Sequence, residues 1–139
     1  MAIVNTLQKC LDSPYLFVDE DAPKRVGSLL LKAGDRLEAA ANILNTGQGD
    51  GADATFLSYE AMFNTLRALV YYHGYREAGL RCLLLACESL YVKKGLVDAQ
   101  HIHDFERVQS LRLPPNESLI AASKFVKRAL ELLTAAPAK

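Results

Sequence analysis

The stretch SYEAMFNTLRALV, residues 58–70, carries the clearest helical pattern in this chain. Apolar side chains at helical spacing occupy more than one side of the segment from residue 54 to residue 73. They are Phe56, Tyr59, Phe63, Leu66 and Val70 on one stripe, with Ala61, Met62, Ala68 and Leu69 beside it. A helix that is apolar most of the way round lies at the centre of a bundle. We therefore predict a central helix over residues 54–73, with Asp53 as its N-cap and Gly74 as its stop.

Further helices are predicted on either side of this segment. Apolar side chains recur at three- and four-residue spacing over residues 23–45, 77–94, 98–111 and 117–133. Helix-start signals precede three of these segments: Asp21 with Pro23, then Asp98, then Asn116. No segment alternates apolar and polar residues as a strand does. We predict an all-α fold, an antiparallel up-and-down bundle of about five helices.

The domain organisation follows from the same pattern. The chain has 139 residues, which is the length of one domain. We predict an N-terminal arm over residues 1–22, with a candidate short helix at residues 3–11. The helical bundle follows over residues 23–135, and residues 136–139 form a C-terminal tail.

The composition is that of a soluble globular protein. Half of the residues are hydrophobic and the formal net charge is zero. The longest apolar run, residues 82–87, is far shorter than a membrane span, and the N-terminus lacks the features of a secretory signal. We expect a cytoplasmic protein that does not enter a membrane.

The three cysteines are Cys10, Cys82 and Cys87. Their odd number, in a chain without an export signal, argues against a disulfide framework. Cys82 and Cys87 stand about 140° apart on a helix, and their spacing matches no zinc motif. We expect all three to be small buried hydrophobic residues.

The order of residues in the central segment resembles the signature of the HEPN superfamily of small helical-bundle proteins. The match consists of Tyr59, Ala61, Met62, Phe63, Arg67, Ala68 and Leu69, followed by Tyr91, Val92, Lys93, Gly95, Phe105, Arg107, Leu111 and Arg112. The resemblance covers roughly residues 26–133. It implies a helical bundle that forms homodimers. Some family members are toxin-like ribonucleases paired with a small nucleotidyltransferase antitoxin. Others are non-catalytic modules that accompany nucleotidyltransferases or are proposed to bind nucleotides.

This sequence departs from the family pattern in three places. Related members have a histidine before their third helix, whereas the corresponding stretch here, EAGLRCLLL at residues 77–85, carries Arg81 and no histidine. Arg112 is followed by Leu-Pro-Pro-Asn at residues 113–116, where the family often has Asp-Tyr. In the catalytic members, four to six residues separate an arginine from the histidine that follows it. No arginine in the second half of this chain has a histidine at that spacing.

Two sets of polar residues are candidates for a site. Arg67 and His73 have the separation of the ribonuclease pair, yet on a continuous helix they point about 120° apart. Glu60 and Arg67 are two helical turns apart with Asn64 between them, so the three share one face. With Tyr59 and, from the resemblance, Arg112, this stripe is the candidate cleft for a ligand or partner. The alternative is that the stripe is only the solvated edge of the helix.

No cofactor and no metal site is expected. His101 and His103 form an H-x-H pair that diverges by about 200° on a helix, and no third ligand is evident. We predict a non-catalytic or degenerate HEPN-like module, dimeric, that binds a nucleotide or a nucleotidyltransferase-type partner. The first alternative is a metal-independent RNA-cleaving toxin of a toxin–antitoxin pair that uses Arg67 and His73. The second is a helical scaffold without a ligand.

Overall fold

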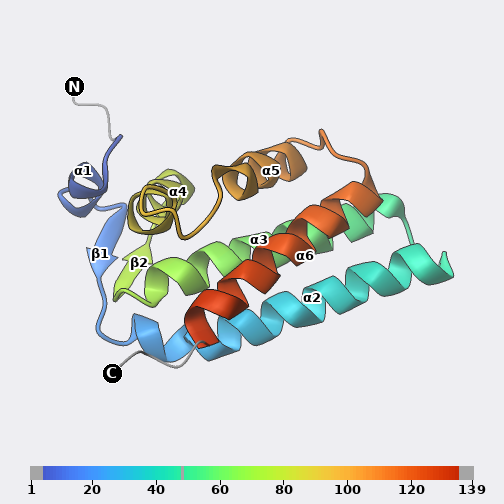
Figure 1. Cartoon of the computed structure of the whole chain (residues 1–139), viewed down its shortest axis with the longest axis horizontal. Helices are drawn as coiled ribbons and strands as arrows, with labels where there is room; N and C mark the ends of the chain where they lie inside the picture. Colours follow the sequence, from blue (N-terminus) through green and yellow to red (C-terminus); the bar gives the residue numbers. More distant parts are fainter. Residues whose placement is uncertain (1–4, 48, 135–139) are drawn as a thin grey trace.

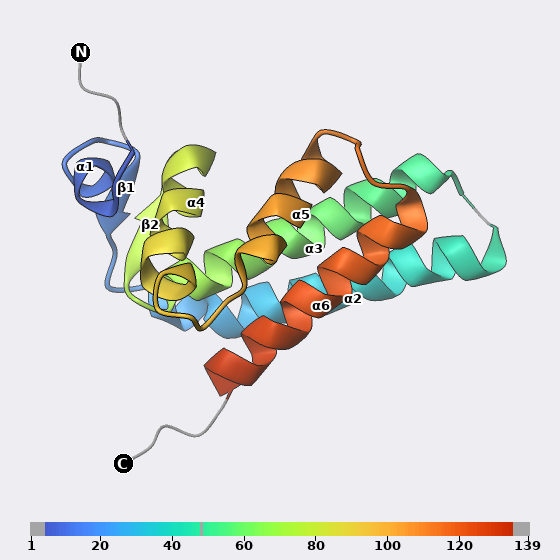
Figure 2. The same ribbon diagram turned by 45° about the horizontal axis from the view of Figure 1, so that its top comes forward.

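Three long helices form the body of the molecule. The computed structural model describes residues 5–47 and 49–134. In it, α2 (Val26–Thr46), α3 (Gly51–Tyr71) and α6 (Pro115–Thr134) pack against one another (Figure 1). After a turn of 45°, α6 is seen to cross in front of α2 and α3 (Figure 2). The chain reverses direction between α2 and α3, as predicted for an up-and-down bundle.

Two shorter helices pack on other sides of α3. They are α4 (Leu80–Cys87) and α5 (Ala99–Gln109), and both contact α3. Because α2, α4, α5 and α6 all pack on it, α3 is the central helix of the bundle, which confirms the prediction from its apolar pattern. The all-α fold class is likewise confirmed. None of the described helices combines the length and apolar composition needed to cross a membrane.

The start of α3 differs from the prediction by one turn. Asp50, not Asp53, is the N-cap: its Oδ1 accepts a hydrogen bond from the backbone N–H of Ala52 at 3.1 Å. A reciprocal hydrogen bond is also present, because Asp53 Oδ2 accepts from the backbone N–H of Asp50 at 3.3 Å. This reciprocal arrangement is a capping box, in which both acidic residues satisfy free N–H groups of the first turn. Gly47, with φ of +68°, ends α2 just before it.

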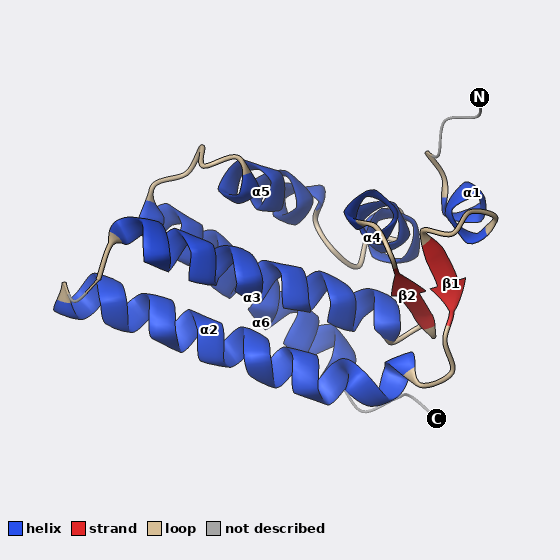
Figure 3. Cartoon of the chain, turned by 180° about the vertical axis from the view of Figure 1, so that it is seen from behind, coloured by secondary structure: helices blue, strands red, loops and turns tan. Residues whose placement is uncertain are grey.

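The segment after α3 is not the single helix predicted for residues 77–94. Its first residues form a strand, β2 (Tyr75–Glu77), which pairs antiparallel with β1 (Leu16–Val18) (Figure 3). After α4, the π-helical segment η2 (Glu88–Val92) follows. The expectation of no strands is therefore wrong. Strands of three residues are too short to display an alternating pattern, so only their pairing reveals them.

The N-terminal segment is ordered by local caps and turns. Helix α1 (Leu7–Leu11) begins after Thr6, whose side chain accepts from the backbone N–H of Lys9 at 3.1 Å. Of the helix predicted at residues 3–11, residues 3 and 4 lie outside the described part. A 3₁₀ turn, η1 (Ala22–Arg25), leads into α2. The predicted cap Asp21 makes no capping hydrogen bond.

The last two helices were predicted with unequal accuracy. Asp98 caps α5 as expected, accepting from the backbone N–H of Gln100 at 2.8 Å. Helix α6 begins at Pro115, so the predicted cap Asn116 already lies inside it. Proline in the first turn loses no hydrogen bond there, because the first N–H groups of a helix have no partner within it.

The cysteines overturn one expectation. Cys10 and Cys82 form a disulfide, with their Cα atoms 5.6 Å apart, and only Cys87 is free. All three are buried, as expected. An odd number of cysteines shows only that at least one of them is left unpaired. The pairing here joins residues 72 positions apart, and only the tertiary fold brings them together.

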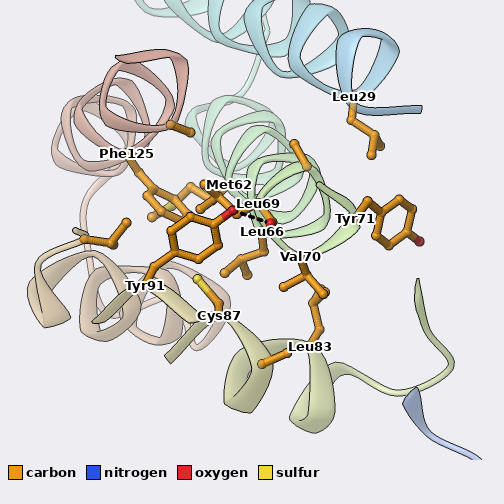
Figure 4. Close-up of a cluster of buried hydrophobic side chains, with 14 of the residues drawn as sticks. Leu29, Met62, Leu66, Leu69, Val70, Tyr71, Leu83, Cys87, Tyr91 and Phe125 are labelled. Carbon is orange, nitrogen blue, oxygen red and sulfur yellow. Dashed lines mark hydrogen bonds between the residues drawn. The ribbon is translucent and has the colours of Figure 1, made fainter. Parts of the chain in front are cut away.

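The core surrounds α3 and includes buried side chains of α2, α4, α5 and α6. Figure 4 shows Met62, Leu66 and Leu69 of α3 facing the side chains of Tyr91 and Phe125. The hydroxyl of Tyr91 donates a hydrogen bond to the backbone carbonyl of Leu69 at 2.6 Å. This bond satisfies the polar end of a buried ring and ties the η2 segment to the central helix.

Candidate functional site

One face of α3 is not covered by neighbouring helices. Six residues of this face line a hollow of about 230 Å³: Phe56, Tyr59, Glu60, Phe63, Asn64 and Arg67. Their spacing of three and four residues places them on a single side of the helix. We refer to these six residues as the α3 groove.

The floor of the α3 groove is aromatic and is held by α5. The ring of Tyr59 stacks on Phe105 with centroids 5.3 Å apart. Phe63 meets the rings of Tyr59 and Phe105 edge-on at 5.8 and 6.2 Å. Edge-on and offset contacts of this kind are the favoured geometries of aromatic pairs. Phe105 is fully buried, so it fixes the two groove rings from below.

The apolar surface continues beyond the groove. A second hollow, of about 300 Å³, shares Phe56 and Tyr59 with the groove and is bounded by Val108, Gln109 and Leu111. Phe56 is 59% exposed and Leu111 is 77% exposed. The sequence pattern placed Phe56 on the packed stripe, and the structure corrects this, because at this end of α3 no helix covers its side chain.

Arg67 is held at one end of the groove by a buried carboxylate. Its guanidinium lies over the Phe63 ring at 4.4 Å, and its Nε donates to Glu77 Oε2 at 2.8 Å. The second oxygen of Glu77 accepts from the hydroxyl of Tyr71 at 2.5 Å. The Glu77 side chain is only 7% exposed. Since Glu77 belongs to β2, the position of Arg67 depends on the two-stranded ribbon.

The phenols of Tyr71, which contacts this carboxylate, and of Tyr59 in the groove are neutral. Burial, followed by the hydrogen bond to Glu77, raises the pKa of Tyr71 to about 12. Burial also raises the pKa of Tyr59, with the positive charge of Arg67 opposing the shift. Neither hydroxyl can therefore act as a base near neutral pH.

The polar rim of the groove carries both signs of charge. Glu60 forms an ion pair with Arg36 of α2, whose Nε lies 3.5 Å from Glu60 Oε1. Both side chains are about one-third exposed. Glu60 and Arg67 stand two helical turns apart, on either side of Phe63 and Asn64. Phe63 therefore lies between the two charged side chains, while Phe56 and Tyr59 lie at the Glu60 end of the groove.

The structure brings together four of the five residues predicted for the cleft. Tyr59, Glu60, Asn64 and Arg67 line the same hollow. Arg112 lines a separate hollow with Ser110 and four residues of α5, namely His103, Glu106, Arg107 and Gln109. From the sequence, Phe56 and Phe63 were expected only to pack in the core. Their spacing nevertheless indicated a place in the groove, because both lie one turn from Tyr59 and Glu60 on the same face.

Arg67 and His73 have separate neighbours within one chain. Helix α3 ends at Tyr71, so His73 has left the helix. Its ring lies edge-on to Tyr72 and Tyr91, with centroids 5.7 and 5.3 Å apart, whereas Arg67 contacts Phe63 and Glu77. Burial, with the positive charge of Lys94, lowers the pKa of His73.

The two histidines of the H-x-H pair also have different surroundings. The His101 ring stacks on Phe125 with centroids 5.2 Å apart, while His103 is exposed. Within the described residues, no three His, Cys, Asp or Glu side chains are grouped so that they could hold a metal ion.

His101 predicts a pH dependence of stability. Burial lowers the pKa of His101 below its ordinary value of 6.5, and this outweighs the opposing effect of Asp98 and Asp104. The unfolded chain therefore binds a proton at this site more readily than the folded chain. The stabilisation is complete above pH 6.5 and is lost as the pH falls through the lower pKa of the folded state.

We expect His101→Phe, which keeps the stacked ring, to reduce the loss of stability between about pH 7.5 and pH 5.5. Urea unfolding at the two pH values measures it. His103→Gln is the control and should retain the full loss. An equal pH dependence in wild type and His101→Phe would contradict the role of His101.

The fold and the groove define the class of the protein. It is an all-α bundle of three long helices and two shorter ones, with one open face on its central helix. A family model described as the HEPN domain matches residues 26–115 of the chain. This is more than half of the chain, and the protein belongs to the HEPN family, which confirms the resemblance seen in the sequence. No curated protein and no solved structure matches the chain.

Proposed function

We propose that this chain is a non-catalytic HEPN module that associates with a second copy of itself through the α3 groove. The observation that carries the proposal is the composition of the groove: the exposed ring of Phe56 and the half-buried rings of Tyr59 and Phe63, on one helix face with two opposite charges. Protein interfaces are rich in Tyr, Phe and Arg at their centre and polar at their rim. The α3 groove has this composition, with Phe56 as its most exposed aromatic residue.

The order of charges along α3 suits a symmetric pair. Glu60 and Arg67 are equally distant in sequence from the midpoint between Phe63 and Asn64. If two α3 helices pack antiparallel around a two-fold axis at that midpoint, Glu60 of each copy faces Arg67 of the other. Such a surface is self-complementary, which a two-fold interface requires.

A nucleotide fits this groove less well than a protein. Phosphate groups are bound by cations and N–H donors, but Glu60 contributes a carboxylate to the hollow. The hollow of about 230 Å³ is also smaller than the roughly 300–1,000 Å³ of typical small-molecule pockets. Nucleotide binding and a nucleotidyltransferase-type partner remain predictions from the sequence.

The ribonuclease alternative has weaker support. A general acid or base must reach the same phosphate as the arginine that stabilises it. Arg67 is directed to Glu77, and His73 lies against Tyr91. Incubating purified wild type and His73→Ala with RNA tests this point, and we expect neither to cleave it. Cleavage by wild type that His73→Ala abolishes would overturn the non-catalytic assignment.

Self-association is tested by sedimentation equilibrium of wild type, Phe56→Glu and Glu60→Arg. A buried aromatic hot spot contributes about 2 kcal/mol, so Phe56→Glu should weaken the dimer about thirtyfold. Glu60→Arg should weaken it because two arginines would face each other. Leu31→Glu is the matched control, since Leu31 is 68% exposed on α2 outside the groove. A monomeric wild type, or equal effects of Phe56→Glu and Leu31→Glu, would refute the proposal.

A further inference from the structure

The N-terminal segment precedes the residues that match the family, yet it is joined covalently to the bundle. Cys10 lies in this segment and Cys82 in α4. We propose that the Cys10–Cys82 disulfide is a reducible latch that holds β1 on β2 and thereby fixes Arg67 in the α3 groove. The proposal rests on the proposed function only where it concerns self-association.

The non-covalent contacts that hold the segment are few. Helix α1 has five residues, far fewer than the number at which an isolated helix becomes stable. The β1–β2 ribbon has three residues in each strand, and a lone two-stranded ribbon is marginally stable in water. Leu16 is its one fully buried strand residue. The disulfide adds a covalent constraint to these contacts and to the packing of Leu7, Leu11 and Leu16 on the core.

The ribbon connects the disulfide to the groove. Its ends are closed by two backbone bonds, from Asp19 N–H to the Gly74 carbonyl at 2.8 Å and from Ala78 N–H to the Tyr15 carbonyl at 2.9 Å. The strand register places Leu16 opposite Glu77.

From Glu77, the path continues into α3. Its two carboxylate oxygens accept from Arg67 Nε and from the Tyr71 hydroxyl. Loss of order in β2 would therefore release the carboxylate that positions Arg67. Cys82 follows β2 by five residues along the chain, so the latch acts beside the strand that carries Glu77.

The reductant we envisage is a dithiol. One of its thiolates attacks the sulfur of Cys10 or Cys82, which breaks the disulfide and forms a mixed disulfide. The second thiol of the reductant then displaces the bound cysteine and becomes part of a new disulfide. Cys10 and Cys82 gain two electrons and two protons and become thiols. Because both cysteines are buried, the segment must lift from α4 before the thiolate can attack.

The experiment compares amide hydrogen exchange of the full chain before and after reduction by dithiothreitol. On reduction, we expect the exchange rates of the β1 and β2 amides to rise at least about tenfold more than those of α2 and α6. The amides of α2 and α6 accelerate only through the lower global stability, whereas the ribbon also opens locally. Cys10→Ala/Cys82→Ala should behave like reduced wild type with or without reductant. Cys87→Ala keeps the disulfide and should respond to reductant as wild type does.

Three results would overturn the latch. The first is three free thiols in unreduced, denatured protein in place of one. The second is equal exchange of β1 and β2 in both redox states. The third is a rise in the exchange rates of β1 and β2 that is no larger than the rise in α2 and α6. Glu77→Gln serves as the second variant. It should loosen Arg67 while the disulfide is closed, seen as a shifted and narrowed Arg67 Nε–H resonance that matches reduced wild type.

Sedimentation of the same samples separates this inference from the proposed function. We expect reduction and Glu77→Gln to weaken self-association in the same direction. A wild type that is monomeric in both redox states refutes self-association through the groove. In that case the exchange rates of β1 and β2 still decide whether the latch exists.

Discussion

Replacing Phe105 with alanine should lower the free energy of unfolding by about 3–5 kcal/mol. The Phe105 side chain is fully buried, and its ring contacts Tyr59 and Phe63. Alanine removes the apolar area of the ring and leaves a cavity between α3 and α5, and these two costs add. Urea unfolding followed by circular dichroism measures the change.

The matched control for this variant is Phe56→Ala, on the same groove. Phe56 is 59% exposed, so its loss should change stability by about 0.5 kcal/mol or less. In self-association assays the order of the two effects should reverse. Phe56→Ala should weaken the dimer more than Phe105→Ala does, because Phe56 forms the groove surface directly. A cost below about 1 kcal/mol for Phe105→Ala would contradict the packing of α5 on α3.

Reducing the Cys10–Cys82 disulfide should lower the free energy of unfolding by about 2–4 kcal/mol. The bond joins residues 72 positions apart, so it closes a long loop in the unfolded chain. Reduction restores the conformational freedom of that loop and so favours the unfolded state. Because oxidised and reduced wild type have the same sequence, their comparison isolates the bond.

The control is Cys10→Ala/Cys82→Ala, in which the same reductant should leave the urea midpoint unchanged. Alanine is used because serine would bury a hydroxyl at each position. If oxidised and reduced wild type unfold at the same urea concentration, the disulfide does not constrain the unfolded chain. If the reductant also shifts the urea midpoint of the double variant, then the reductant acts on the protein at a place other than this disulfide.

The predicted helices were located best where the signal is local. The central helix was found because apolar side chains within it repeat at helical spacing, and that spacing depends only on near neighbours. Its cap was misplaced because Asp50 and Asp53 both fit the composition of an N-terminus. In the structure they act together, and only the hydrogen bonds show which one is the cap.

The groove was partly predictable for the same reason. Tyr59, Glu60, Asn64 and Arg67 share a face of one helix, and helical geometry alone brings them together. Arg112 follows the end of α5 instead. Leu111, which precedes it, has a left-handed backbone with φ of +61°, and Arg112 lines the hollow beside α5. Its placement depends on this turn and on how α5 packs.

The sequence by itself determined the helical class, the central helix and the HEPN family, because these follow from short-range periodicity and from the order of residues along the chain. The tertiary structure alone decided the Cys10–Cys82 pair, the β1–β2 ribbon, the exposure of Phe56 and the contact of Glu77 with Arg67. Each of these joins segments through the fold or depends on which neighbour covers a side chain. No local pattern encodes such contacts, because their energy arises only when the helices are packed.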